Sequence, residues 1–184
     1  TWFKKYLAVG AYPFYKKVKE RYSFQLINIL NMVIENDLPN LVKMDYKSVH
    51  KLRRLMHFIS ESLPFQPNIS KLSSKVEVSR NVLLEFLDYL DKAQIIHALK
   101  SPSKSDSHLT KPDKVLLNNK NIMNTLSYGQ LNIGSAREAF FVSQAKSKHK
   151  VNIPKITDFM VDDTHYFEIG GPSKGFNQIA GVPN

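Results

Sequence analysis

The chain has 184 residues, of which 42% are hydrophobic and 11% aromatic, so it can build a hydrophobic core and does not have the composition of a disordered tail. It contains no cysteine, which excludes disulfides, thiolate metal sites and cysteine nucleophiles. The formal net charge of +10 favours a polyanion such as nucleic acid as a partner, although an ordinary solvated surface explains it equally well.

No apolar run approaches the roughly 20 residues that a membrane-spanning helix needs, so the sequence predicts no membrane partner. Together with the lack of cysteine, this indicates a cytoplasmic protein. The chain begins at Thr1, which indicates either processing or a piece of a longer protein.

The first 45 residues predict helices over 3–9 and 22–36. The second helix carries an apolar stripe at three- and four-residue spacing: Leu26, Ile29, Leu30, Val33 and Ile34. Pro39 is expected to end this helical segment, because proline lacks the backbone N–H that a helix interior uses.

Three further helices and a hairpin are predicted between residues 46 and 120. Ser48 is expected to cap a helix to about Leu63, Asn68 or Ser70 a short helix to about Val76, and Ser79 a longer helix to about Ala93. The stretches "IIHAL" and "KVLL" predict two strands, joined by the polar "KSPSKSDSHLTKPD". Three helices followed by a hairpin predict a winged helix-turn-helix.

The predicted recognition helix has a poor exposed face for reading DNA, because it presents Glu85 and Asp88 beside Asn81 and Lys92. The start of this helix and the wing are better suited to phosphate contact. The candidate DNA-binding residues are Ser79, Arg80, Asn81, Lys100, Lys104 and Lys111. The alternative is a winged helix that makes only protein–protein or interdomain contacts.

After Asn118 the pattern changes to a mixed α and β unit. Asn121 is expected to start one or two helical turns, and Ser135 to cap a helix. Short strands follow in "VNIPK", "DFMV" and "HYFEIGG". A loop over residues 162–164 would pair Val161 with His165 and place Asp158 opposite Glu168, whereas a two-residue turn would put them on opposite faces. The burial pattern favours the first register.

Nucleases of the restriction-endonuclease type carry an Asp on one strand and Glu-x-Lys on the next, often with a helical Glu. Here Glu138, Asp158 and Glu168 match that pattern, and Gly170 stands where the lysine belongs. The three carboxylates are therefore candidate ligands for Mg²⁺, the ion expected at such a site. The missing lysine predicts a degenerate site without efficient cleavage.

Several stretches together resemble one family: "GAYPFY", "VIENDLP", "HFISESLPFQPNISKLSSKVEVSRNVLLEFLDYLDKAQIIHAL", "KPDKVLLNN" and "NIGSAREAFFVSQ" with "FEIGG". In this order they resemble the C-terminal portion of prokaryotic AAA-type ATP-binding proteins. The resemblance implies an ATPase module, a helical lid, a winged helix and a degenerate nuclease-like domain of unknown function.

On that resemblance, the fold class is α+β, with residues 1–45 as the end of an ATPase lid, 46–120 as the winged helix and 121–184 as a partial restriction-endonuclease-like α/β unit. The chain has no Gly-rich phosphate loop, so it is expected to bind no cofactor itself, and ATP is implied only for the full-length protein. The predicted function is a non-catalytic binding and regulatory region of an AAA-type ATPase, with DNA and the missing N-terminal ATPase module as partners. The alternative is a divalent-metal-dependent nuclease-like domain that lacks activity.

Overall fold

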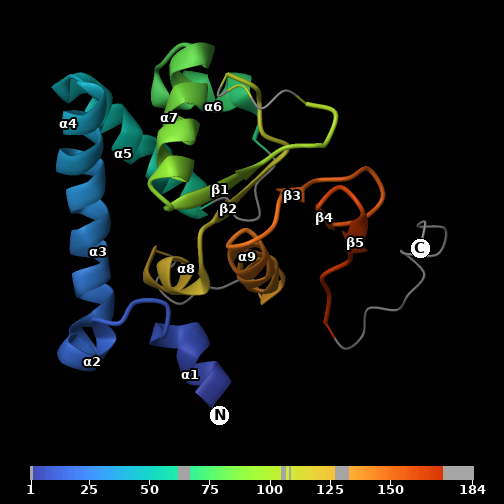
Figure 1. The fold of residues 1–184 in the computed structure, drawn as a ribbon. Coiled ribbons are helices and arrows are strands. Elements are labelled where there is room, and N and C mark those ends of the chain that lie inside the picture. The colour runs from blue at the N-terminus through green and yellow to red at the C-terminus, as the bar shows by residue number, and fades with distance from the viewer. Residues whose placement is uncertain (1, 62–66, 105–106, 108, 127–132, 172–184) are drawn as a thin grey trace.

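The computed structural model describes residues 2–61, 67–104, 107, 109–126 and 133–171. The described chain is an α+β protein in which helices pack around a two-stranded antiparallel sheet and a three-stranded antiparallel sheet lies beside them. In Figure 1 a long helical column lies on one side, three helices and a hairpin lie at the top and centre, and a small sheet lies on the opposite side.

The helical column, which we define as residues 22–42, is longer than the sequence pattern predicts. The N-terminal elements are α1 (Trp2–Val9), α2 (Tyr15–Val18), the 3₁₀ turn η1 (Lys19–Arg21), α3 (Tyr22–Met32), the π-helical turn η2 (Val33–Asp37) and α4 (Leu38–Val42). The prediction that Pro39 ends the helix is wrong, because helical structure continues to Val42. The Leu38 N–H bonds to the Val33 carbonyl, five residues back, and this wide turn accommodates the proline ring without an N–H.

The next elements have the order of a winged helix: α5 (Tyr46–Glu61), α6 (Ile69–Val76), α7 (Arg80–Lys92), β1 (Ile96–Leu99) and β2 (Lys114–Leu117). Asn68 and Ser79 accept the backbone N–H groups of Lys71 and Val82, which confirms both as caps. The cap predicted at Ser48 is wrong: the Asp45 carboxylate accepts the Ser48 N–H at 2.7 Å, so α5 begins earlier. The end of α5 predicted at Leu63 lies outside the described residues.

The remaining elements are α8 (Lys120–Leu126), α9 (Ile133–Ala145), β3 (Val151–Asn152), β4 (Phe159–Val161) and β5 (His165–Phe167). Ser135 is not a cap but a buried residue inside α9, whose described part begins at Ile133. The predicted hairpin register is confirmed, since Val161 pairs with His165 and Phe159 with Phe167. Asp162 and Asp163 in the turn both have positive φ.

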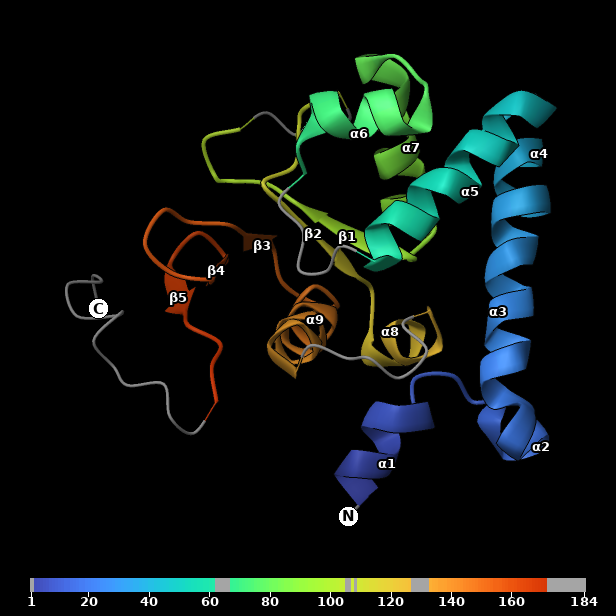
Figure 2. The ribbon, with the colours of Figure 1, turned by 180° about the vertical axis from the view of Figure 1, so that it is seen from behind.

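Two hydrophobic clusters hold these elements together. The larger runs from Tyr22 through α5, α6, α7 and the hairpin to Ala139 of α9, so the helical column and the winged helix share one core. The smaller cluster joins Leu99 and Leu116 of the hairpin to α9, β3 and β4. The Ile153 N–H also bonds to the Lys100 carbonyl at 2.9 Å, which ties the second sheet to the first. Figure 2 shows the helices and the two sheets from behind, with β3 next to the hairpin of β1 and β2.

Within the described residues, none of the helices combines the length and the apolar character that crossing a membrane requires.

Candidate nucleic-acid interface

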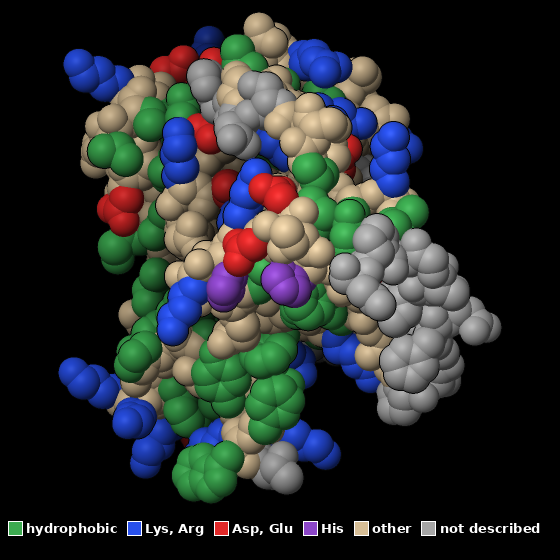
Figure 3. Space-filling model, turned by 45° about the vertical axis from the view of Figure 1, so that its right-hand side comes forward, with side chains coloured by type: hydrophobic (Ala, Val, Ile, Leu, Met, Phe, Trp, Pro, Cys, Tyr) green, Lys and Arg blue, Asp and Glu red, His purple; other side chains and the backbone are tan. Residues whose placement is uncertain are grey.

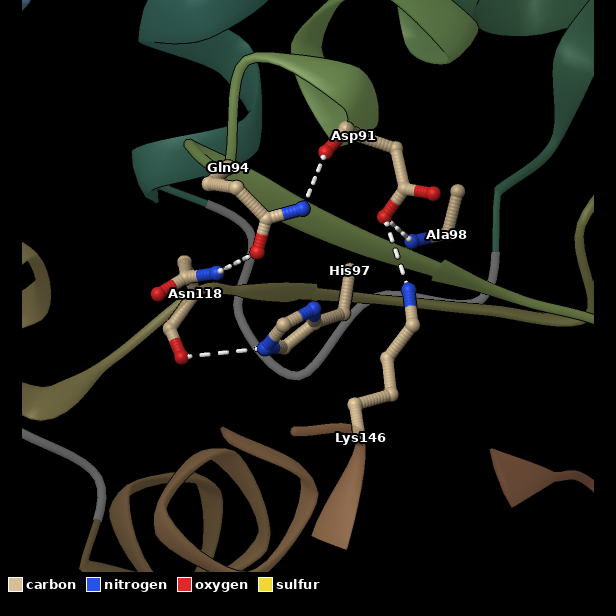
Figure 4. A network of polar contacts seen from close by, with 6 residues as sticks. All are labelled: Asp91, Gln94, His97, Ala98, Asn118 and Lys146. Carbon is tan, nitrogen blue, oxygen red and sulfur yellow. Dashed lines mark hydrogen bonds and ion pairs between the residues drawn. The ribbon is translucent and has the colours of Figure 1, made fainter. Parts of the chain in front are cut away.

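Two carboxylates near the C-terminal end of α7 form contacts within the protein. Asp91 accepts the backbone N–H of Ala98 and the ammonium group of Lys146, both at 3.1 Å (Figure 4). Asp88 pairs with Lys92 on the same helix at 2.7 Å. The Asp91–Lys146 ion pair joins the winged helix to the segment that follows α9. Of the two carboxylates that weakened the prediction of a DNA-reading helix, Asp88 therefore has a structural partner.

His97 lies buried beside this ion pair. Its Nε2 is 3.1 Å from the Asn118 carbonyl oxygen, and because a carbonyl only accepts, Nε2 carries the proton. Burial, and after it the nearby Lys146 ammonium, lowers the pKa of His97 to about 4, against the opposing effects of Asp91 and the Asn118 hydrogen bond. The side chain is therefore neutral at physiological pH and acts as a core residue.

Two of the predicted wing cations fix the wing itself. Lys100 Nζ donates to the Ser107 carbonyl at 2.8 Å. Lys104 Nζ donates to the Lys111 carbonyl at 3.1 Å and pairs with Asp113 at 2.6 Å. These contacts hold the ends of the loop between β1 and β2, so Lys100 and Lys104 are less available to a ligand than the sequence implies.

A large cleft lies between the winged helix and the second sheet, and we call it the basic cleft. Its volume is about 1260 Å³. It is lined by the start of α6, by Arg80 at the start of α7, by the base of the wing at 101–103 and 111–114, and by residues between Lys150 and Tyr166. Basic and acidic side chains adjoin one another in the upper half of the face shown in Figure 3.

The charges in the basic cleft are unequal. Its cations are Arg80, Lys111, Lys114, Lys150 and Lys155, and its carboxylates are Asp113, Asp158 and Asp163. Asp113 and Asp163 are paired with Lys104 and Lys150, and Lys114 is paired with Glu138 of α9 at 2.7 Å. Arg80, Lys111 and Lys155 form no ion pair with any carboxylate in the described part of the chain. These three cations come from three different walls and leave the cleft electropositive.

The six predicted DNA-binding residues therefore have different roles. Arg80 and Lys111 both line the basic cleft. Ser79 caps α7 with its hydroxyl, at 3.3 Å from the Val82 nitrogen, and Asn81 is exposed on α7 outside the cleft lining.

The three predicted metal ligands are not brought together. Glu138 is held by Lys114. Asp158 and Glu168 do lie opposite each other, but each accepts a backbone N–H: Glu168 that of Asp158 at 3.0 Å, and Asp158 that of Ile169 at 2.8 Å. Among the described residues, no group of three His, Asp or Glu side chains could hold a metal ion. These two hydrogen bonds join the open ends of β4 and β5, and the arrangement fits that structural role better than a Mg²⁺ site.

Lys150, Lys155 and Tyr166 are among the cleft residues that sequence reasoning missed. The available signal was the "VNIPK" stretch, where a basic residue follows proline in a connection between short strands. Nothing in the sequence indicated that this connection faces the wing, because that placement depends on the second hydrophobic cluster.

The fold and the cleft define an α+β protein with the element order of a winged helix and an electropositive groove at its side. Residues 1–136 match the family described as a domain of unknown function, DUF8612, and the chain belongs to that family. A stretch of 113 residues is 21% identical to the uncharacterized protein MJ1637 of Methanocaldococcus jannaschii. That stretch covers 61% of this chain and 24% of the relative's length. No solved structure matches the chain.

Proposed function

We propose that this chain is a non-catalytic binding module that holds the phosphate backbone of nucleic acid in the basic cleft. The observation that carries the proposal is the set of three cations, Arg80, Lys111 and Lys155, that line one cleft from three walls without a carboxylate partner among the described residues. Phosphate contacts by lysine and arginine supply most non-specific affinity for nucleic acid. The net charge of +10 adds long-range attraction.

The charge proposal is tested with the triple variant Arg80→Ala, Lys111→Ala, Lys155→Ala. Fluorescence anisotropy at about 50 mM salt should show binding of labelled DNA by the parent chain, and the logarithm of affinity should fall with the logarithm of salt by about 0.9 for each duplex phosphate neutralised. The triple variant should bind more weakly and with a smaller salt slope.

The matched control is Lys16→Ala, Lys17→Ala, Lys47→Ala, which removes the same charge from exposed positions outside the cleft. If this control loses as much affinity as the cleft variant, the binding is a diffuse charge effect and the proposed site is wrong. A parent chain that binds no oligonucleotide under these conditions would overturn the function itself.

We further propose that the module regulates an AAA-type ATPase of which it is the C-terminal region. The supporting observations are the sequence resemblance and the order of helical column, winged helix and mixed α/β unit. The chain alone should hydrolyse no ATP. In the full-length protein, nucleic acid should change the rate of ATP hydrolysis, and the triple cleft variant should abolish that response while its basal rate is kept. Hydrolysis by the isolated chain, or an unchanged response in the variant, would contradict this role.

A further inference from the structure

We infer that the basic cleft accepts an unpaired strand of nucleic acid and stacks a base on Tyr166. The inference rests on the proposed function and specifies the form of its ligand. Three features carry it: the shape of the cleft, the apolar surface on one of its walls, and the position of its free cations.

The shape of the cleft suits a strand better than a duplex. The cleft is bounded by the start of α6 and Arg80 on one side, by the wing base on another, and by residues 150–166 on the third. Its volume of about 1260 Å³ is somewhat larger than a typical small-molecule pocket of roughly 300–1,000 Å³. A duplex is a rigid rod whose major groove alone is about 12 Å wide, so it contacts a protein mainly from outside. A flexible single strand can enter a groove between three walls.

One wall of the cleft is apolar and aromatic. Tyr166 of β5 and Met160 of β4 are cross-strand partners, and both line the cleft. Ile153, Pro154 and Ile156 extend the same wall, and Ile156 is 54% exposed. Within the described part of the chain, Tyr166 makes no contact with another aromatic ring. A partly exposed aromatic ring without a ring partner, in a basic groove, is the combination that single-strand binding proteins use to stack bases.

The cations without a carboxylate partner line the same cleft as this wall, so a strand held there can meet them with its phosphates. Lys155 belongs to the connection between β3 and β4, next to the apolar wall, while Arg80 and Lys111 lie on the facing walls. A duplex buries its bases inside and offers no base face for stacking except at its ends. The wall around Tyr166 would therefore add affinity for an unpaired strand that a duplex cannot gain.

The walls are also held in place before any ligand binds. The Ile153 N–H bonds to the Lys100 carbonyl, and Phe159 of β4 lies in the same cluster as Leu99 and Leu116 of the hairpin. Because the two sides share a core, the cleft is preformed and a strand does not have to assemble it.

The experiment compares four labelled ligands of about 12 nucleotides, a length within the range that single-strand binding domains cover. They are a thymidine strand, a uridine strand, a duplex containing the same thymidine strand, and an abasic strand that keeps the phosphates without bases. The thymidine or the uridine strand should bind at least about tenfold more tightly than both the duplex and the abasic strand. The comparison of the first two shows whether the cleft prefers the DNA or the RNA form of the strand, which differ in the sugar 2′ position and the base 5-methyl group.

The variant Tyr166→Ala should lower affinity for the thymidine strand by about 5- to 100-fold, the equivalent of one base stack, and leave the abasic strand unaffected. Tyr166→Phe keeps the ring and should bind as the parent does, which separates lost stacking from lost folding. Tyr46→Ala, at an exposed tyrosine of α5 outside the cleft, is the matched control and should change nothing.

The outcomes separate this inference from the proposed function. If the thymidine and abasic strands bind equally, or the duplex binds more tightly, while the triple cation variant still loses affinity, then the inference is wrong and the proposed function stands. If Tyr166→Phe loses as much as Tyr166→Ala, stacking is not the cause and the inference fails. If none of the four ligands binds, both fail.

Discussion

The elements α5 to β2, which have the order of a winged helix, and the terminal unit, residues 133–171, are stabilised in different ways. In the winged helix, long helices bury leucine and isoleucine side chains completely, as at Leu52, Leu55 and Ile59. In the terminal unit the strands have only two or three residues. Its loops are fixed by polar contacts, such as those of Asp162 with His149 and of Asp163 with Lys150.

This difference shows which region depends on the other. Hydrophobic burial is insensitive to pH and supplies most of the stability of a domain. A sheet of such short strands has little burial of its own, and the terminal unit therefore relies on the hairpin residues Leu99 and Leu116 for its core. Only the winged helix is expected to remain folded when the contacts between the regions are lost.

The largest effect is expected from Leu55→Ala, because Leu55 is 0% exposed. The variant should lower the free energy of unfolding by about 2–5 kcal/mol in urea titrations, through lost burial and a residual cavity. Both regions should unfold together. The control Leu41→Ala removes a leucine that is 81% exposed and should change stability by no more than about 0.5 kcal/mol. A terminal unit that stays folded after the winged helix has melted would reverse the proposed dependence.

The pH dependence of stability tests the comparison through His97, a buried titratable residue of the hairpin that lies near Lys146 of the terminal unit. As the pH falls through 6.5, the unfolded chain takes up a proton that the folded protein binds only near pH 4, so stability decreases across this window. The difference between the two pKa values corresponds to about 3 kcal/mol.

Urea titrations between pH 7 and pH 4 measure this loss. The variant His97→Gln can still donate an N–H to the Asn118 carbonyl but does not titrate, so its stability should depend less on pH by about that amount. Parallel pH profiles for the two proteins would show that His97 has the same pKa in the folded and the unfolded chain, which would contradict the prediction.

Asp91→Asn should separate the two regions more gently. Asparagine can still accept the Ala98 N–H but loses the charge that holds Lys146. The expected loss is about 1 kcal/mol, because the pair is partly exposed. Amide exchange should quicken over residues 146–167 and stay unchanged in α5 and α7. The control Asp88→Asn breaks a pair within α7 only. Equal effects of the two variants would mean that the Asp91–Lys146 pair does not join the regions.

The smallest effect is expected from Asp162→Asn in the turn of the terminal unit. The His149 side chain and the Lys150 N–H, as hydrogen-bond donors, lower the pKa of the Asp162 carboxyl. The contribution of Asp162 is therefore present above pH 3.8 and is lost as the pH falls from there toward the lowered pKa. Asparagine tolerates the positive φ at this position. The protection factor of the Lys150 amide should fall as the parent chain is acidified and should not change with pH in the variant. The same fall in the variant would assign it to another group.

The sequence predicted the parts of this molecule that depend on local chemistry. The caps Asn68 and Ser79 and the register of Val161 with His165 were predictable, because capping and burial act over a few residues. The pairing of Lys114 with Glu138 and the position of Lys155 in the cleft were not, because they depend on how distant segments pack. Local chemistry also misled at Ser48, where the neighbouring Asp45 is the stronger acceptor.

The π-helical turn at residues 33–37 corrects a rotational phase error in the helical column. The buried residues Leu26, Leu30, Ile34 and Leu38 recur every four positions. On a regular helix of 3.6 residues per turn, each such step rotates the stripe by about 40°, so the fourth residue would point well away from the first. The wider turn takes more residues per revolution and rotates the stripe back. Deleting one residue from 33–37 would leave Leu38 eleven positions after Leu26, only about 20° away from it on a regular helix. The deletion should therefore convert the π-helical turn into α-helix and keep Leu38 in the core.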